Sequence, residues 1–297
     1  MLNINGNKNT GFSHLSKIHP CLGGEANSNF GRIHLPVSPA CNIQCRFCKR
    51  DCNDNEDRPG VAKGILSPKD ALETVKKALE LCPQITVVGI AGPGDTLATP
   101  KAIETFRLVD KEYPDLIKCL STNGLLLYRY AQELYDAGVR TVTVTVNAVD
   151  PYIQSQIISH IVYEEKKYYG EEAAQILIDN QLRGITKMSK LGVIVKVNSV
   201  LIPGINDEHI EEIAKTVKDA GATLYNIIPL IPQHELSHIS APTCKELDKA
   251  RAAAEKYIEV FRHCKHCRAD ACGIPGEEDL SSNLYGKHEH LETFSHG

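Results

Sequence analysis

The sequence predicts an α/β fold, a partial (β/α)6 barrel with an N-terminal arm and a C-terminal tail. Six strand-like segments alternate with helix-like segments, and such alternation favours a parallel sheet with right-handed crossovers. Six units are fewer than the eight of a closed barrel, so we expect the sheet to stay open. In such folds the chemistry lies at the carboxyl ends of the strands. A length of 297 residues suits a single barrel.

The strands are expected at residues 32–38, 84–91, 116–122, 140–147, 193–201 and 223–228. The helices are expected at residues 67–81, 100–113, 126–137, 171–191, 207–220 and 244–261. Ser67 followed by Pro68 is typical of a helix N-cap and first position, whereas Gly138, Gly192 and Gly221 indicate helix ends. We therefore divide the chain into an arm (1–31), a barrel (32–262) and a C-terminal segment (263–297) that carries further cluster ligands.

The composition is that of an ordinary soluble protein, with 42% hydrophobic and 24% charged residues. The 33 basic and 37 acidic residues nearly balance, which argues against a nucleic-acid footprint or a membrane-surface patch. No apolar stretch is long enough to span a membrane, and residues 1–10 lack the apolar core of a signal peptide. We therefore expect a cytoplasmic protein whose partners include neither nucleic acid nor a membrane.

Eleven cysteines are many for such a protein, and in a reducing compartment clustered cysteines more often bind metal than form disulfides. Cys41, Cys45 and Cys48 follow a Cys-x3-Cys-x2-Cys pattern just after the first expected strand. Three thiolates in one short loop can hold three irons of a cubane cluster and leave the fourth iron open to a small molecule. Zinc is the main alternative, but structural zinc usually has four ligands, commonly from paired Cys-x2-Cys knuckles.

This cysteine spacing at the end of a first strand resembles that of the radical S-adenosylmethionine (SAM) superfamily. The resemblance implies that Cys41, Cys45 and Cys48 hold a [4Fe–4S] cluster whose open iron chelates SAM. It also implies that electron transfer from the reduced cluster cleaves SAM to a 5′-deoxyadenosyl radical. The protein would then bind and orient the cofactor and exclude side reactions. Phe47 resembles the aromatic residue that this motif carries near the cluster or the adenine.

Polar residues and glycines at successive strand ends fit a cradle for SAM or substrate. In related enzymes a Gly-rich segment after the second strand binds the methionyl amine, and glycine permits close approach of the backbone. Taken singly, a Gly-Pro-Gly run is usually a turn, and each Asn is a turn former or a cap. Taken together, the residues predict contacts to SAM or substrate. They are Gly92, Gly94, Asp95, Thr122, Asn123, Asn147 and Asn198.

Five more cysteines and one histidine lie where further clusters could form. Cys264 and Cys267 make a Cys-x2-Cys pair, a half-site for iron–sulfur or zinc. The others are Cys21, His34, Cys52 and Cys119. A lone strand cysteine is more often a small buried hydrophobe than a ligand, and a lone strand histidine is usually a core residue. Spacing alone does not group the six.

Five segments make the resemblance more specific, because they look like those of the NifB family, which builds the iron–molybdenum cofactor of nitrogenase. They are residues 19–21, 39–45, 58–61, 89–95 and 267–270. The likeness covers nearly the whole chain and is to the short, stand-alone form without a NifX-like domain. It implies two further [4Fe–4S] clusters, K1 and K2, which are substrates.

Matching by motif assigns the remaining ligands to these clusters. His34, Cys52 and Cys119 would hold K1, and Cys21, Cys264 and Cys267 would hold K2, which leaves Cys82, Cys244 and Cys272 as structural residues. The loop between Cys48 and Cys52 is shorter than in familiar members, and Glu56 is a further candidate oxygen ligand to K1.

The resemblance implies that the enzyme fuses two four-iron clusters and inserts a SAM-derived carbide and a sulfide, giving the eight-iron precursor NifB-co. One SAM would donate a methyl group and a second would supply the hydrogen-abstracting radical. Implied partners are a NifU-like scaffold, a ferredoxin-type reductant, and NifX or NifEN downstream. Two alternatives stay open: a radical SAM enzyme whose auxiliary clusters serve a peptide or small molecule, and a non-catalytic iron–sulfur carrier. A carrier would need no SAM cradle.

Overall fold

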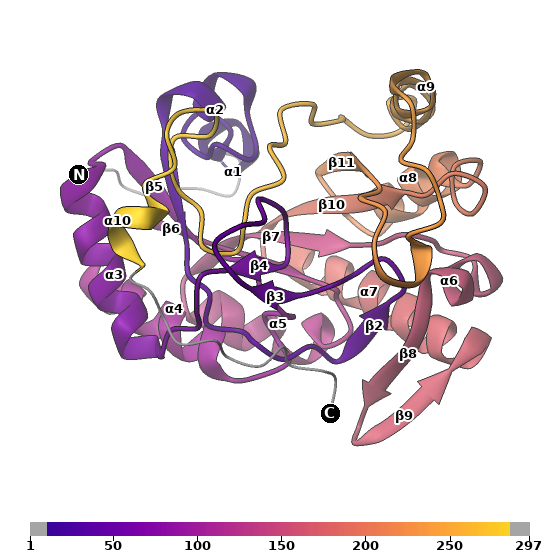
Figure 1. Ribbon diagram of the computed structural model, residues 1–297, viewed down its shortest axis with the longest axis horizontal. Coiled ribbons are helices and arrows are strands. Elements are labelled where there is room, and N and C mark those ends of the chain that lie inside the picture. The colour runs from indigo at the N-terminus through magenta and orange to yellow at the C-terminus, as the bar shows by residue number, and fades with distance from the viewer. Residues whose placement is uncertain (1–10, 286–297) are drawn as a thin grey trace.

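The computed structural model describes residues 11–285 and contains the expected open parallel sheet. Its strand order is β11-β10-β7-β6-β5-β1-β12, with all neighbours parallel except β12, which is antiparallel to β1. The strands are β1 (Gly31–His34), β5 (Ile85–Ile90), β6 (Ile117–Thr122), β7 (Val139–Thr145), β10 (Ile194–Leu201), β11 (Leu224–Pro229) and β12 (Cys272–Gly273). The sheet curls into a half-barrel, which confirms the predicted partial barrel (Figure 1).

Helices between consecutive parallel strands cover the outside of the half-barrel, as expected for β–α units (Figure 1). They are α3 (Pro68–Leu81), α4 (Lys101–Glu112), α5 (Leu127–Asp136), α7 (Gly170–Lys190) and α8 (Ile210–Asp219). The Ser67 hydroxyl accepts the Asp70 N–H at 3.2 Å, as an N-cap does. Gly138, Gly192 and Gly221 end three helices with φ of 85°, 80° and 107°, a region that favours glycine. No helix among residues 11–285 is long and apolar enough to cross a membrane.

The last expected helix is shorter than predicted, because α9 (Cys244–Ala254) ends before the expected residue 261. The chain beyond it pairs with the outer edge of β11: Tyr225 N–H donates to Glu259 O at 2.9 Å, and Phe261 N–H donates to Tyr225 O at 2.7 Å. An edge strand leaves backbone groups without partners, and pairing them competes with further helix.

The sequence analysis missed a small antiparallel sheet beside the cysteine triple. β8 (Ile158–Tyr163) pairs with β9 (Lys166–Tyr169) on one side and with β2 (Ile43–Cys45) on the other. The other short elements are α1 (Gly11–Leu15), α2 (Gly24–Asn29), β3 (Asp51–Cys52), β4 (Val61–Ala62), α6 (Pro151–Ile157), η1 (His234–Leu236) and α10 (Ser281–Leu284).

The N-terminal arm closes one end of the half-barrel. Leu15 and Leu22 from the arm pack with Phe261 against apolar residues near the amino ends of four parallel strands. Those strand residues are Val87, Ile117, Ile194 and Leu224. A larger apolar core fills the space between the outer face of the sheet and the helices. The inner face therefore stays available for a site between the arm and the carboxyl ends of the strands.

Candidate active site

A cavity of about 350 Å³ runs along the inner face of the half-barrel. Alternate residues of a strand point to the same face of a sheet, so Arg32 and His34 of β1 both line it, as do Lys196 and Asn198 of β10. The strand register extends the wall, since His34 lies beside Gly89 of β5 in the sheet. The cavity thus connects the carboxyl ends of the strands with the arm.

Fifteen of the seventeen residues expected at the site line this cavity. They are Cys21, His34, Cys41, Cys45, Phe47, Cys48, Gly94, Asp95, Cys119, Thr122, Asn123, Asn147, Asn198, Cys264 and Cys267. Gly92 and Cys52 do not line it, and neither do the three cysteines expected to be structural. The cavity therefore brings both expected ligand groups and the strand-end polar residues into one space.

The cysteine triple is held by the small antiparallel sheet. Cys45 ends β2, and the Gln44 amide donates to Cys45 O at 2.8 Å and to Cys48 O at 3.2 Å. Burial raises the pKa of the Cys41 thiol to about 11 and that of Cys48 above its ordinary value, while the nearby Arg50 guanidinium lowers both. The pKa of Cys45 is raised most by burial and then by the other two sulfurs. Three converging thiols beside a cation fit an anionic cluster.

Asp95 joins the ends of β5 and β6 behind the triple. Its buried carboxylate accepts the Leu97 N–H at 3.0 Å, the Thr122 hydroxyl at 2.9 Å and the Asn123 N–H at 2.6 Å. Burial raises the pKa of Asp95, and these donors oppose the rise. The Asn123 amide donates to Asn42 Oδ1 at 2.7 Å and lies 3.9 Å from Cys41 Sγ. Asp95 holds Asn123 in place, and Asn123 in turn positions the cysteine loop through Asn42.

Two buried glutamine oxygens in the cavity wall have no hydrogen-bond partner among the described residues. They are Oε1 of Gln154 and Oε1 of Gln181. Gln181 is fixed by its amide nitrogen, which donates to Asn123 O and Thr145 O, both at 2.8 Å. A buried polar atom without a partner is costly, so these oxygens fit a polar ligand such as SAM. Sequence reasoning missed both residues, because each lies inside a helix.

His34 is oriented as a metal ligand would be. Its Nδ1 lies 3.0 Å from Arg268 O, and a carbonyl oxygen can only accept, so Nδ1 carries the proton. Burial lowers the pKa of His34 to about 4, which keeps the ring neutral. The lone pair is then on Nε2, as in metal sites where a backbone carbonyl accepts the other ring N–H and so orients the ligating imidazole. A side chain at Gly89 would approach the ring to 2.9 Å, so glycine makes room for it.

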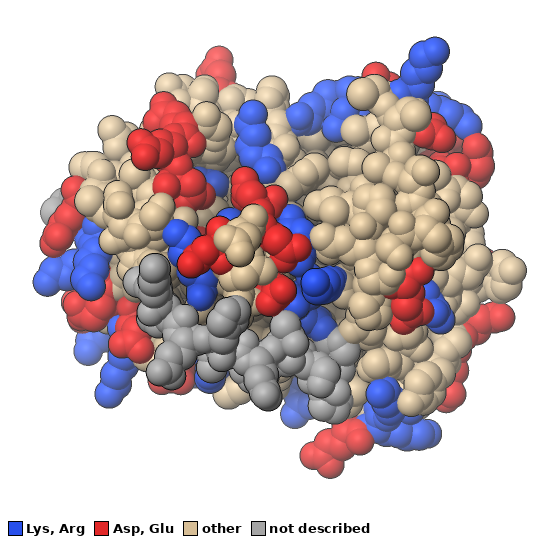
Figure 2. All heavy atoms as spheres, in the orientation of Figure 1, with Lys and Arg blue, Asp and Glu red and all other residues tan. Residues whose placement is uncertain are grey.

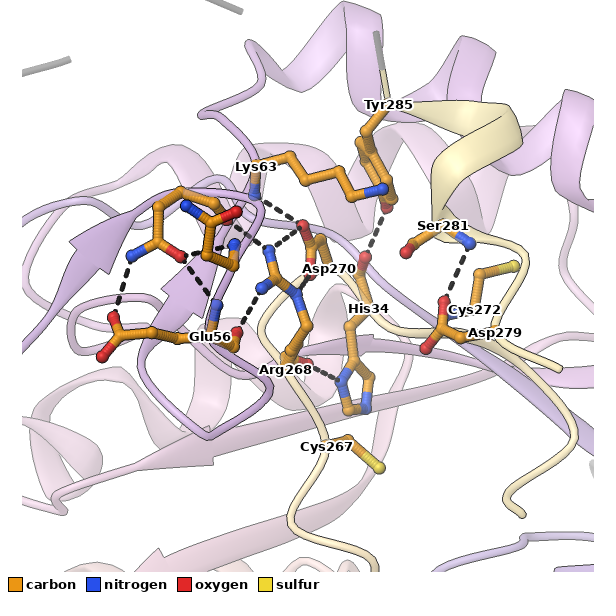
Figure 3. A network of polar contacts seen from close by, with 12 residues as sticks. His34, Glu56, Lys63, Cys267, Arg268, Asp270, Cys272, Asp279, Ser281 and Tyr285 are labelled. Carbon is orange, nitrogen blue, oxygen red and sulfur yellow. Dashed lines mark hydrogen bonds and ion pairs between the residues drawn. The ribbon is translucent and has the colours of Figure 1, made fainter. Parts of the chain in front are cut away.

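The carbonyl that orients His34 belongs to a network of polar contacts (Figure 3). The Arg268 guanidinium donates to the Asp270 carboxylate at 2.8 Å, to Asn53 O at 2.8 Å and to Glu56 O. The Tyr285 hydroxyl donates to His34 O at 2.6 Å. Contacts among β1, the loop that contains Asn53 and Glu56, and the C-terminal segment therefore fix the His34 imidazole.

The end of the cavity beside the arm holds the second group of thiols, Cys21, Cys119, Cys264 and Cys267. Burial raises the pKa of Cys21 to about 12. His19 positions Cys21, because its Nδ1 accepts the Cys21 N–H at 3.1 Å while its Nε2 lies 3.3 Å from the Thr141 hydroxyl. Both ring nitrogens are thus in use, and burial lowers the pKa of His19 to about 3.

Cys52 and Glu56 lie outside this cavity. Cys52 is buried in β3, which pairs with β4, and the Glu56 carboxylate accepts from Arg58 at 2.9 Å and from Asn53 at 2.8 Å. Among residues 11–285 no three His, Cys, Asp or Glu side chains are close enough to share one metal ion. A cubane takes one thiolate per iron, so donors that are too far apart to share one ion can still each bind a different iron of a cluster.

Two charged residues of the cavity, Arg32 and Lys196, were not expected at the site. The sequence did carry a signal for them, because each interrupts an apolar strand two residues before an expected site residue, His34 or Asn198. Strand periodicity then places both members of each pair on one face.

Comparison with known proteins is consistent with this geometry. The Radical SAM superfamily model matches residues 35–217. The chain is 49% identical over 276 residues to the FeMo cofactor biosynthesis protein NifB of Methanocaldococcus infernus, covering 92% of this chain and 91% of that one. It is 48% identical to the protein of the same name from Methanocaldococcus jannaschii, covering 97% of both.

A solved structure supports the fold independently. A radical SAM methyltransferase from Sphaerobacter thermophilus superposes with a TM-score of 0.57 at 17% identity, covering 77% of this chain and 65% of that one. The chain is therefore a radical SAM enzyme and belongs to the NifB family.

Proposed function

We propose that this enzyme takes two [4Fe–4S] clusters as substrates and fuses them into the eight-iron precursor of the nitrogenase cofactor, inserting a SAM-derived carbide and a sulfide. The relatives named for FeMo cofactor biosynthesis support the overall role. The observation that carries the proposal is that one cavity holds the cysteine triple together with His34 and four further thiols. A single-cluster radical SAM enzyme has no use for the second group.

A cluster bound by Cys41, Cys45 and Cys48, with SAM on its open iron, would supply methyl transfer and radical chemistry. The chain itself binds and orients the cluster and SAM. The hydrogen bonds from Gln44 hold the cysteine loop, Asp95 and Asn123 fix the strand ends behind it, and the unpartnered oxygens of Gln154 and Gln181 offer acceptors to SAM.

The second ligand group suits substrates that must leave. Four thiolates would bind a substrate cluster strongly and retain it. Three ligands per cluster, one of which is a neutral imidazole in the case of K1, bind it more weakly. We assign His34, Cys119 and Cys52 to K1, and Cys21, Cys264 and Cys267 to K2. Because Cys52 lies outside the cavity in this structure, the assignment to K1 requires the β3–β4 loop to move. A cluster-assembly scaffold, a ferredoxin-type reductant and a downstream carrier complete the proposed sequence.

Iron counting tests this proposal. After anaerobic reconstitution we expect about twelve irons per chain in the native protein and about eight in the Cys41/Cys45/Cys48 triple Ala variant, four per cluster. Reduced native protein should cleave SAM, and the variant should not. A matched control is the Cys82/Cys244/Cys272 triple Ala variant, which also lacks three cysteines but none that line the cavity, and should keep all its iron. Retention of only one cluster's iron by native protein would rule out the two-substrate proposal.

A further inference from the structure

Two cations are buried in the cavity wall without a carboxylate partner. Arg32 is 5% exposed and Lys196 is 6% exposed, and neither forms an ion pair within residues 11–285. The Nε of Arg32 has no hydrogen-bond partner in that part of the chain. The other buried cations are paired: Lys118 with Asp110, Arg58 with Glu56 and Arg268 with Asp270. Lys196 Nζ lies 5.3 Å from the centroid of the Phe261 ring, and Asp279 favours the charged form of Arg32 without forming an ion pair with it. Neither contact supplies a paired counterion, and a buried charge without one is strongly unfavourable, so the two cations require a further explanation.

Both cations contact residues of the second group of thiols, and they reach it from strands that lie far apart in the sheet. Arg32 Nη2 donates to Cys267 Sγ at 3.1 Å, and Lys196 Nζ donates to the backbone oxygen of Cys21 at 3.2 Å. β1 carries Arg32 and β10 carries Lys196, with β5, β6 and β7 between them in the sheet. The sheet curls (Figure 1), and both side chains line the same cavity. The space that they share also holds Cys119 and Cys264.

We propose that Arg32 and Lys196 are positioning residues that bind the anionic iron–sulfur substrate by its charge, without ligating iron. This inference rests on the proposed function. Every thiolate that binds a cluster brings a negative charge into the cavity, and the two buried cations in its wall offset that charge. They stabilise the loaded site without adding a bond to iron that release would have to break. Hydrogen bonds to cluster sulfurs and nearby charge also tune the reduction potential.

A purely structural role for the two residues predicts something different. Lys196 also holds the arm through Cys21 O, and Arg32 holds β12 through Gly273 O at 2.6 Å. Glutamine keeps a neutral donor on a somewhat shorter side chain, and lysine at position 32 controls for the loss of length because it is also shorter than arginine but keeps the charge. Substitutions that keep a donor but remove the charge therefore separate the two roles.

The experiment compares Lys196→Gln with Lys196→Arg, and Arg32→Gln with Arg32→Lys, each in the Cys41/Cys45/Cys48 triple Ala background. In that background the remaining iron belongs to the substrate clusters alone. Iron and acid-labile sulfide per chain are measured after desalting, together with the midpoint potential of the remaining clusters by EPR titration. We expect the Gln variants to lose roughly half of the retained iron or more, and their midpoint potential to move to more negative values, because the reduced cluster loses a compensating charge. The Arg and Lys variants should stay close to the parent.

Lys118→Gln is the matched control, since it removes a buried strand lysine that pairs with Asp110 and does not line the cavity. It should leave iron content and potential at the parent values, and circular dichroism checks that all variants are folded. If a folded Gln variant at each position keeps the parent's iron and potential, the inference is overturned while the proposed function stands. If the parent itself retains no iron, both are overturned.

Discussion

Among the glycines that line the cavity, Gly94 leaves the least space for a side chain. An added Cβ would lie 2.0 Å from Ala40 O, although φ at this position needs no glycine. Two backbone hydrogen bonds hold the contact: Gly94 N–H to Ser38 O at 2.7 Å and Asp95 N–H to Ala40 O at 2.9 Å. The segment after β5 thus lies directly against the chain that enters the cysteine loop. Gly92 differs, because its φ of +125° is what favours glycine there.

For Gly94→Ala we therefore expect a loss of about 2–4 kcal/mol in the free energy of unfolding, from the steric clash alone. The cysteine loop should shift, and the reconstituted protein should lose SAM cleavage. Gly204→Ala is the control, because Gly204 has φ +75° but open space around it, so only the backbone strain of about 1 kcal/mol applies. Denaturant unfolding measures both. Equal losses in the two variants would contradict the close-approach argument.

Tyr225 gives a pH dependence whose sign can be worked out. Burial raises the pKa of this phenol, and its hydroxyl donates to Ser199 at 2.7 Å. In the unfolded chain the Tyr225 phenol ionises near pH 10, whereas in the folded chain it stays protonated to higher pH. Its contribution to stability is therefore present below pH 10 and is lost as the pH rises above it. Tyr225→Phe should be about 1 kcal/mol less stable at neutral pH. That gap should shrink by roughly 1.4 kcal/mol per pH unit above 10. A constant gap from pH 8 to 11 in denaturant unfolding would refute this.

At the scale of elements, the ends of β7 and β10 are tied together by one side chain. Asn206 is fully buried, its Oδ1 accepts the Ile202 N–H at 2.7 Å, and its amide donates to Asn147 O and Val200 O, both at 2.8 Å. The Asn147 side-chain oxygen accepts the Val200 N–H at 2.9 Å in turn. Asn147 was expected to contact a ligand, but its side-chain oxygen already accepts a hydrogen bond that joins the two strands.

Asn206→Ala should cost about 2–4 kcal/mol, because two carbonyls and one N–H lose their buried partner. The carboxyl end of β10 should loosen, so backbone amides near Val200 should exchange with deuterium faster. Asn29→Ala is a suitable comparison, since that exposed amide also donates to a backbone oxygen, Glu25 O at 2.7 Å, and should cost less than about 0.5 kcal/mol. Hydrogen exchange measured by mass spectrometry would show whether only the first variant opens the strand end.

The elements that could be predicted from sequence are those with a strong period or a local end signal. The Thr–Val alternation predicts β7, and the Ser67–Pro68 pair predicts the start of α3. The β8–β9 hairpin was missed, because the exposed β9 carries Lys166, Lys167 and two tyrosines without a clear apolar alternation. Two partners of Arg268, Asn53 O and Glu56 O, were also beyond reach, since they lie more than 200 residues away in the chain and nothing local specifies them.

At the scale of the whole molecule, the two ends of the chain and one central loop enclose the site. β12 pairs with β1, the arm closes the amino ends of the strands, and Arg268 holds the loop that contains Cys52. Acidic side chains gather on the surface over β3 and β4, with basic ones beside them (Figure 2). Asp54 and Asp57 of that loop are exposed. The Arg268 guanidinium joins this loop to the C-terminal segment through Asn53 O and Glu56 O, beside the backbone hydrogen bond from Ala269 N–H to Val61 O at 2.8 Å.

Arg268→Lys should release this loop without leaving Asp270 as a buried charge alone. A lysine ammonium can pair with Asp270, but it cannot also reach Asn53 O and Glu56 O as the guanidinium does. We expect Cys52, which is 8% exposed, to be alkylated about tenfold faster in the cluster-free variant, as loss of one or two hydrogen bonds predicts. Cys82 is 6% exposed and distant from the loop in sequence and fold, so its alkylation rate reports global unfolding and should not change. Mass spectrometry of both peptides measures the two rates. Equal acceleration at Cys82 would mean that the whole chain loosens, and an unchanged rate at Cys52 would mean that Arg268 does not hold the loop closed.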